Sequence, residues 1–316
     1  MKIGTAAIDG RERVVVLLDD PGDLAVLLPA TLPGVGELAA DWPRWRPRVE
    51  EAVERAGAEG VAAEPMDDLT WLPPVPRPGK VVCVALNNSA NKDRIMSGPE
   101  HPATFPKPTT SLVGHQQPIR IRPEYGRVHP EPELAVVIGR GGRDIAREDA
   151  LDHVFGYTII NDLTSPTMRA EDTFHYRAIH PDPERPGDAT AIRYVDTWVS
   201  YPGRYKGADT FGPIGPWIVT RDEVPDPHDL TIQCTHQGRV VTKDSTANLK
   251  HKVADVLSFL SSYSTLEPGD IIAMGTALKP SGAGSAVQNV DLATLGGPIS
   301  VSITGIGELS NPVELG

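Results

Sequence analysis

The sequence predicts a β-rich α+β protein with a small N-terminal α/β domain. Short apolar runs of strand character recur from Lys80 almost to the C-terminus, and only a few segments have helical spacing. Alternating strand and helix units with a glycine-rich first turn, which would indicate a dinucleotide-binding fold, are missing. With 316 residues, 40% of them hydrophobic, the chain can bury a substantial core.

The N-terminal segment, residues 1–72, predicts the small domain. Strands are expected in "KIGTAAID" and "ERVVVLLDD", and a helix in "WRPRVEEAVERAGAEG", which closes on a glycine. The prolines of "WLPPVPRPGK" exclude a regular helix or a central strand there. We therefore expect a linker at residues 73–79 and a second domain over residues 80–316.

The second domain is expected to consist mainly of strands. The strand-like runs are "VVCVAL", "LAVVIG", "FGYTIIND", "GPWIVT", "LTIQCTHQGRVV", "DIIAMGT" and "ISVSITGIGEL". Two helices are expected, in "REDALDHV" and in "LKHKVADVLSFLSSY". In the longer one the apolar residues follow helical spacing, at Val253, Val256, Leu257 and Leu260.

Charge and cysteine content restrict the function classes. The 30 basic and 42 acidic residues give a net charge of −12, which makes nucleic acid and anionic membranes poor partners. The sequence shows no signal-peptide or membrane-spanning apolar segment, so a cytoplasmic location is expected. Cys83 and Cys234 lie in strand-like runs without a second cysteine or histidine nearby, which favours buried free thiols.

Acidic residues stand at the mouth of a buried strand in "VHPEPELAVVIGR". Glu131 and Glu133 are two apart, so their side chains share a face of an extended strand. Two carboxylates at the entrance to a core require a positive partner. A third acid, Asp162, follows the strand-like run of "VFGYTIINDLTSP". Three carboxylates at strand ends suit Mg²⁺ or Mn²⁺, with Ca²⁺ also possible; two solvated glutamates are the alternative.

A resemblance covering residues 80–313 adds to this interpretation. Seven segments, "KVVCVALN", "FPKPTTSLVGHQQPI", "EPELAVVIGR", "GYTIINDLT", "YKGADTFGPIGPWIVT", "STLEPGDIIAMGT" and "GIGELSNPV", resemble in content and order those of the fumarylacetoacetate hydrolase superfamily. The resemblance implies a mixed β-roll catalytic domain, commonly a homodimer, and a Mg²⁺ or Mn²⁺ ion held by Glu131, Glu133 and Asp162.

The resemblance also implies a reaction class and supporting residues. Members act on 2-oxo acids and 1,3-dicarbonyl acids whose enolate is stabilised by the chelating metal. Lys206 resembles the family lysine that stabilises the developing oxyanion, and a cation among carboxylates stays protonated. Gly275 and Thr276 resemble the turn that holds a substrate carboxylate. An ordinary surface lysine is the alternative for Lys206.

The sequence departs from the family where many hydrolytic members carry a His and a Glu that activate water. The matching positions in "ALNNSANKDRIM" are Asn91 and Arg94. An amide does not titrate and a guanidinium stays protonated, so neither is a general base near neutral pH. Asn91 is instead expected to contact substrate. His129, two residues before Glu131, is a further candidate to reach the site, with a solvated turn histidine as the alternative.

A second departure is the long segment between Asp162 and Lys206, with an insertion at about residues 168–203. Arg169 can take the place of a family arginine and bind substrate, and His175 can replace the missing base. The segment is rich in aromatic residues: Phe174, Tyr176, Tyr194, Trp198, Tyr201 and Tyr205. It can cap the pocket, enlarge it, pack a dimer contact, or merely cover the surface.

Three functions follow from these observations. The first is a metal-dependent hydrolase that cleaves a carbon-carbon bond in an acylpyruvate-like 1,3-dicarbonyl or 2-oxo acid, with Lys206 and His175 as catalytic residues. The second is a decarboxylase, tautomerase or isomerase that uses the same site without water. The third is a non-catalytic binding or scaffold protein, which the coexistence of three carboxylates and the lysine disfavours.

Overall fold

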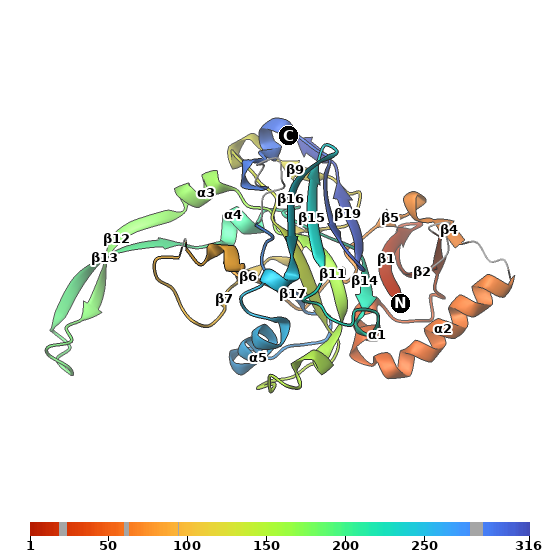
Figure 1. Cartoon of the computed structure of the whole chain (residues 1–316), viewed down its shortest axis with the longest axis horizontal. Coiled ribbons are helices and arrows are strands. Elements are labelled where there is room, and N and C mark those ends of the chain that lie inside the picture. Colours follow the sequence, from red (N-terminus) through yellow and green to blue (C-terminus); the bar gives the residue numbers. More distant parts are fainter. Residues whose placement is uncertain (19–23, 60–62, 94, 279–286) are drawn as a thin grey trace.

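Strands dominate the structure and a few helices lie around them, which confirms the predicted fold class (Figure 1). The computed structural model describes residues 1–18, 24–59, 63–93, 95–278 and 287–316. None of the helices in these ranges combines the length and the apolar character that a bilayer span requires.

The main sheet has twelve strands and includes the N-terminal segment. Along its path lie β4 (Ala63–Pro65), β3 (Leu24–Leu27), β2 (Arg11–Leu17), β1 (Lys2–Ile8), β14 (Gly212–Thr220), β11 (Val154–Asn161), β10 (Pro132–Ile138), β17 (Ile271–Ala273), β6 (Val81–Ala85) and β7 (Ala103–Lys107). Off this path, β5 (Thr70–Trp71) pairs with β1 and β8 (Leu112–Val113) with β14. The antiparallel pairing of β1 with β14 makes the N-terminal strands continuous with the central sheet.

The remaining strands form a second sheet and two separate pairs. The second sheet has the order β16 (Arg239–Ser245), β15 (Thr231–His236), β18 (Ile299–Ile303) and β19 (Gly307–Asn311). The pairs are β9 (Ile119–Ile121) with β20 (Val313–Leu315), and β12 (Thr173–Pro181) with β13 (Ile192–Ser200). Val301 and Leu309 of the second sheet share a buried core with Ile159 of the main sheet, so the two sheets pack face to face.

The helices are α1 (Val35–Ala40), α2 (Trp42–Glu59), α3 (Pro166–Glu171), α4 (Gly203–Gly207), α5 (Val253–Tyr263) and α6 (Leu292–Leu295). Helix α5 confirms the longer predicted helix, and its predicted apolar residues are buried. The helix expected over residues 147–154 is wrong. Only Ala150–His153 form a short 3-10 turn, because Val154 already pairs with Ile138 as the start of β11. A segment this short does not form a stable helix by itself. Val154 is β-branched and is therefore incorporated into the sheet.

Strand β10 is buried on both faces, which explains its continuous apolar run. Leu134, Val136 and Ile138 face the core shared with the second sheet. Ala135 and Val137 face the other core, which α1 and α2 cover. Two-sided packing fixes the register of this strand, because a one-residue slip would exchange both sets of side chains. The strand therefore presents the residues at its N-terminal end in a defined orientation.

The close approach of β11 to β14 depends on Gly156. A Cβ atom at this position would lie 2.3 Å from the carbonyl oxygen of Val219. We expect Gly156→Ala to lower the free energy of unfolding by about 1–3 kcal/mol, because the backbones of both strands must shift. Denaturant unfolding measures this loss. Gly203→Ala is the control, since no atom lies within 4 Å of a Cβ there; equal effects of the two substitutions would contradict the interpretation.

Candidate metal centre

The antiparallel register of β10 and β11 brings three carboxylates together. Glu133 lies opposite Ile160, and Pro132 lies opposite Asn161. The next pair along the ladder is Glu131 and Asp162, joined by a 2.9 Å bond from the Asp162 N–H to the Glu131 carbonyl. Side chains two apart share a face, so one ligand oxygen from each acid lies within 4.8 Å of the others. These three residues, Glu131, Glu133 and Asp162, are called the carboxylate triad below.

Two buried lysines lie against the triad. The Nζ of Lys206, on α4, donates to Glu131 Oε2 at 2.9 Å and to Asp162 Oδ2 at 2.7 Å. The Nζ of Lys107, at the end of β7, lies 2.8 Å from Asp162 Oδ1. Lys107 also donates to the carbonyl oxygens of Lys206 and Phe211. The Lys206 ammonium is the positive partner that the sequence required beside Glu131, and both ammonium groups lie against Asp162.

Lys107 was missed by the sequence analysis. It lies in "FPKPTTSLVGHQQPI", one of the segments that carry the family resemblance, but no role followed from its position. A lysine at the end of an apolar run and before a proline was the available signal. Its side chain is fully buried, which for lysine normally requires a charged or hydrogen-bonded partner. The pairing of β7 with β6 brings Lys107 next to Asp162, which lies 55 positions further along the chain. This contact depends on the folded sheet and has no local sequence signal.

Burial and charge act on the pKa values of the site in opposite directions. Burial raises the pKa of Glu133 well above its ordinary value, and the neighbouring Asp162 and Glu131 add to this shift. Burial would also raise the pKa of Asp162, but the two ammonium groups outweigh it and leave the pKa lowered. Burial would lower the pKa of Lys206, but the triad carboxylates outweigh this effect and raise its pKa above the ordinary lysine value. Lys206 is therefore a permanent cation here.

The donor set fits a hard divalent cation. Three carboxylates against two ammonium groups leave an excess negative charge when all are ionised, and a buried excess charge is costly. Asp162 Oδ1 accepts no hydrogen bond from the described residues, although the Lys107 ammonium lies close to it. All the ligand atoms are oxygens, which Mg²⁺, Mn²⁺ and Ca²⁺ prefer. These residues therefore fit a site of that class.

Neighbouring hydrogen bonds orient the two glutamates. The Thr164 hydroxyl donates to Glu131 Oε1 at 2.7 Å, and the Gly275 N–H donates to Glu133 Oε2 at 2.7 Å. Gly275 has a φ of +100°, and a Cβ there would lie 2.8 Å from the Cβ of Asn87. Only glycine combines this conformation with this close approach. Gly275 was expected to bind substrate; in the structure its N–H binds a triad carboxylate.

The turn that contains Thr276 is tied to the segment that carries Asn91. The side-chain amide of Asn88 donates to the Thr276 carbonyl at 3.2 Å and to Asp244 Oδ2 at 2.9 Å. Asn91 is buried at the end of a 3-10 turn that Asn88 caps. Thr276 is partly exposed, and its hydroxyl donates to the Ala277 carbonyl oxygen at 3.2 Å. Arg94, the second position matched to the water-activating pair, lies outside the described residues.

Two other expected site residues lie apart from the triad. Arg169 is exposed on α3, and among the described contacts its guanidinium touches no triad residue. His175 is exposed on β12, where its ring stacks on Trp198 with 4.0 Å between the ring centroids. His129, in contrast, is buried, and its Nε2 lies 4.0 Å from Glu131 Oε1. Burial lowers the pKa of His129, which keeps it neutral.

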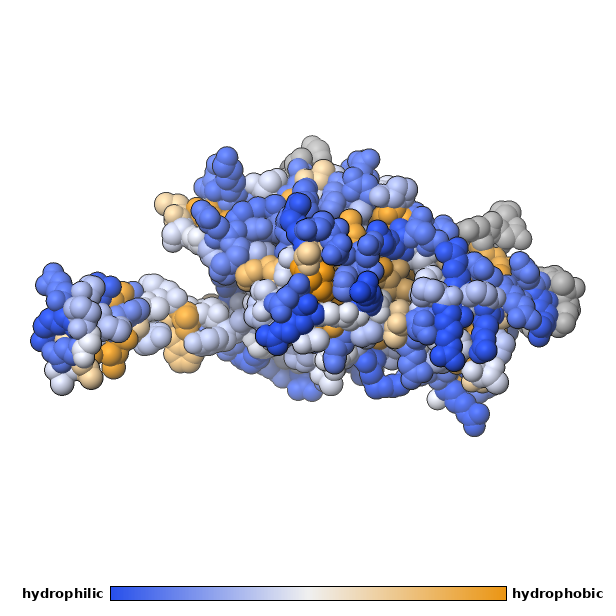
Figure 2. Space-filling model, turned by 90° about the horizontal axis from the view of Figure 1, so that it is seen from below, coloured by the Kyte–Doolittle hydropathy of each residue, from blue (hydrophilic) through white to orange (hydrophobic). Residues whose placement is uncertain are grey.

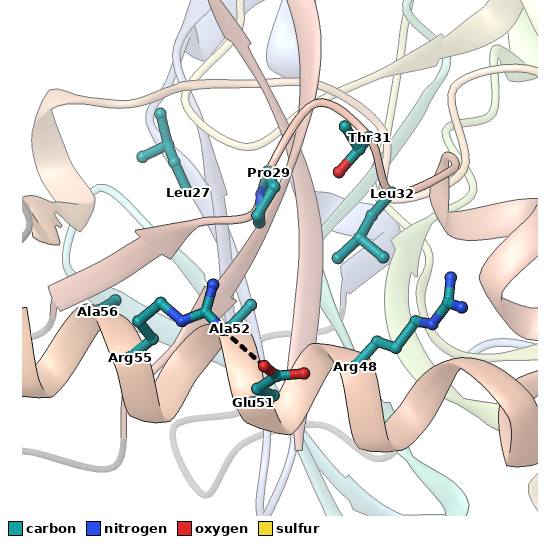
Figure 3. A pocket seen from close by; sticks show the side chains of 9 residues that line it. All are labelled: Leu27, Pro29, Thr31, Leu32, Arg48, Glu51, Ala52, Arg55 and Ala56. Carbon is teal, nitrogen blue, oxygen red and sulfur yellow. Dashed lines mark hydrogen bonds and ion pairs between the residues drawn. The ribbon is translucent and has the colours of Figure 1, made fainter.

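A separate cavity of about 400 Å³ lies between β3 and α2 (Figure 3). Its floor is apolar, and its charged rim includes Arg48, Arg55 and Glu51. Arg55 and Glu51 pair with each other at 2.6 Å on one helix. Arg48 lies over the ring of Trp45, and the polar groups of this cavity do not converge on a common point, so it does not resemble a catalytic site.

Comparison with known proteins gives one consistent result. The family described as fumarylacetoacetate (FAA) hydrolase C-terminal matches residues 80–314. The human mitochondrial oxaloacetate tautomerase FAHD2A is 32% identical over 260 residues, which is 82% of this chain and 74% of that protein. The maleylpyruvate hydrolase of Sphingobium sp. SYK-6, solved with manganese(II) and pyruvate, has a TM-score of 0.73 at 28% identity, with 100% of both chains covered.

A third similar structure represents another activity. The 5-carboxymethyl-2-hydroxymuconate delta-isomerase of Mycobacterium smegmatis has a TM-score of 0.69 at 27% identity, and the match covers 100% of this chain and 99% of that one. The similar proteins thus include a tautomerase, a hydrolase and an isomerase.

Metal binding is expected to stabilise the protein through the triad. Mn²⁺ at about 100 times its dissociation constant adds about 2.7 kcal/mol to the free energy of unfolding, which raises the melting temperature. Glu133→Gln removes a charged ligand and should abolish most of this increase. Glu54→Gln, an exposed glutamate on α2, should retain it. A native melting temperature that ignores Mn²⁺ would contradict the metal site.

Metal affinity is expected to increase with pH. In the folded protein without metal, Glu133 holds its proton to a pH well above 4.5, its ordinary pKa. A cation must displace that proton, so binding releases protons and weakens as pH falls through this range. Calorimetric titration with Mn²⁺ in two buffers of different ionisation enthalpy measures the proton release. Proton uptake on binding, or an affinity that rises at lower pH, is the contrary result.

Proposed function

The chain belongs to the fumarylacetoacetate hydrolase family, and from this premise we propose that it is a divalent-metal-dependent enzyme that stabilises the enolate of a 2-oxo acid. The observation that supports this proposal most directly is the buried, protonated Lys206, which donates hydrogen bonds to two members of the carboxylate triad. Glu131, Glu133 and Asp162 would hold Mg²⁺ or Mn²⁺. The ion would withdraw electron density from the carbonyl group that it chelates.

Lys206 acts as an electrostatic group and not as a base. Its pKa is raised, so it keeps its proton and presents a fixed positive charge where an oxyanion develops. Such a charge is most effective in a buried site because water does not screen it. Lys107 serves as a positioning residue, since its Nζ binds the carbonyl oxygen of Lys206 and faces Asp162. It thereby fixes the backbone of α4 relative to the triad.

The substrate carboxylate is assigned to the turn at Thr276. This residue is partly exposed next to Gly275, whose N–H already binds Glu133. A carboxylate bound by the Thr276 hydroxyl would lie beside the triad, as chelation of a 2-oxo acid requires. Asn91 can donate its amide hydrogens to a second polar group of the substrate, because an amide is a donor without a charge.

Proton transfer within the substrate, by tautomerisation or double-bond isomerisation, is the reaction that these residues support best. Hydrolysis requires a group that removes a proton from water. Asn91 cannot do so, and His175 is exposed and stacked on Trp198. A tautomerase or isomerase consumes no water: the proton that leaves one atom of the substrate returns to another, and neutral His129, whose Nε2 lies 4.0 Å from Glu131 Oε1, can carry it. The similarity to an oxaloacetate tautomerase and to a delta-isomerase supports this choice.

Cleavage of a carbon-carbon bond in an acylpyruvate-like acid is the second candidate. The sequence alone places it first, and the similarity to a maleylpyruvate hydrolase solved with manganese and pyruvate supports it. The same triad and Lys206 would stabilise the pyruvate enolate that leaves. The two candidates differ in whether water enters the products.

Assays on oxaloacetate and on acylpyruvates in the presence of Mn²⁺ separate the candidates. We expect the ultraviolet absorbance of the enol to decay with unchanged substrate mass, and Lys206→Met to lower kcat by about 100- to 1000-fold. The variant should still bind Mn²⁺. Lys243→Met, at an exposed lysine on β16, should leave kcat unchanged. Formation of two acids from an acylpyruvate would instead establish hydrolysis.

A further inference from the structure

A second cavity, of about 730 Å³, lies where the junction of α1 and α2 meets one end of the main sheet. Its walls come from the chain around Trp42, from the end of β10 and the start of β11, and from the segment after β14. Figure 2 views the molecule from below and shows hydrophobic residues in the middle of an otherwise hydrophilic body. The volume of this cavity, called the sheet-end cavity below, lies within the range of about 300–1,000 Å³ that is usual for small-molecule sites.

The sheet-end cavity is separate from the metal centre. It shares no residue with the carboxylate triad, and along β11 it extends only as far as Tyr157. Tyr157 lies five positions before Asp162, which corresponds to roughly 16 Å along a strand. A ligand that fills this cavity therefore binds apart from the chemistry of the triad.

Aromatic rings form one apolar wall of the sheet-end cavity. The ring of Phe155 meets that of Trp42 edge to face, with 5.4 Å between the ring centroids. Further apolar side chains line the cavity: Ala39, Leu151, Val154, Val224, Pro225 and Pro227. Since the two rings already hold each other in place, a flat apolar ligand would not have to order them on binding.

All but one of the charged side chains that line the cavity have an ionic partner. The pairs are Arg46 with Asp222 at 2.9 Å, Arg221 with Asp152 at 2.9 Å, and Asp41 with Arg44 at 3.9 Å. The exception is Arg140, whose guanidinium has no partner within the described part of the chain. The cavity therefore offers one positive charge that is free to bind an anionic group.

A buried uncharged donor lines another part of the cavity. Tyr157 is only 1% exposed, and its hydroxyl has no hydrogen-bond partner among the described residues. Burial raises the pKa of Tyr157 to about 12, so the hydroxyl keeps its proton and can donate it. The charged groups that act on this hydroxyl are Arg221 and Asp226, which places it apart from Arg140. A buried hydroxyl without a partner is costly, so an acceptor is expected there.

We propose that the sheet-end cavity binds an aromatic monocarboxylate that carries a second oxygen at its other end. The carboxylate pairs with Arg140, the rings lie against Trp42 and Phe155, and the second oxygen accepts the hydrogen of the Tyr157 hydroxyl. A polyanion fits less well, because three aspartates line the same cavity. A cation fits less well, because those aspartates are already paired.

Calorimetric titration with 6-hydroxy-2-naphthoate tests the charged contact. Mn²⁺ and oxalate are present throughout, so that the probe does not bind at the triad. We expect the probe to bind, and Arg140→Met to weaken binding about tenfold or more, the factor for a lost hydrogen bond to a charged group. Arg143→Met, at an exposed arginine outside the cavity, should leave the affinity unchanged. Absence of binding to the native protein, or equal effects of the two substitutions, overturns the proposal.

The second oxygen is tested by removing it from the probe and its partner from the protein. 2-Naphthoate lacks the hydroxyl, and we expect the native protein to bind it more weakly than 6-hydroxy-2-naphthoate. In Tyr157→Phe this difference should disappear, because the phenyl ring fills the same space without a donor. The melting temperature of the variant checks its folding. Equal binding of the two probes by the native protein, or an unchanged difference in the variant, overturns the proposal, and neither readout depends on enzymatic activity.

Discussion

The balance of charge among three carboxylates and two ammonium groups is the constraint on which the site depends. Each of these groups is costly to bury alone. When all five are ionised, the cluster carries one excess negative charge. The balance explains the opposite pKa shifts of Glu133 and Asp162, because only Asp162 lies within ion-pair distance of both lysines. It also gives a divalent cation a physical reason to bind. The same excess of acid that is unfavourable in the free protein favours the binding of a cation.

The sheet provides the precision that this balance requires. β10 is packed on both faces, so its register is fixed, and β11 aligns Asp162 with Glu131 by continuing the same ladder. Gly275 holds the third carboxylate, because its N–H donates to Glu133. This bond requires a backbone conformation with positive φ that a side chain would prevent. The carboxylate triad is thus held by regular backbone structure, and the residues proposed to bind substrate come from the turns next to it.

The β12–β13 hairpin, residues 173–200, which is called the arm here, connects the site to the outer surface. It is inserted between the third carboxylate and the lysine that binds it, and its two strands continue directly into α3 and α4. Arg204 joins these helices at the root of the arm, two residues before Lys206. These bonds restrain the element that carries Lys206.

The sequence by itself determined which residues form the triad and which lysine faces it. Glu131 and Glu133 follow the two-residue period of a strand, and Asp162 and Lys206 stand in recognisable segments. It also determined the β-rich class and helix α5, because apolar periodicity is local information. It identified the insertion at about residues 168–203 but not its form as a β-hairpin, and it did not identify Lys107 or the bond from Gly275 to Glu133. The helix expected at residues 147–154 failed because the pairing of Val154 with Ile138 was stronger than local preference. These features depend on contacts between residues far apart in the chain, and only the register and packing of the folded sheets decide them.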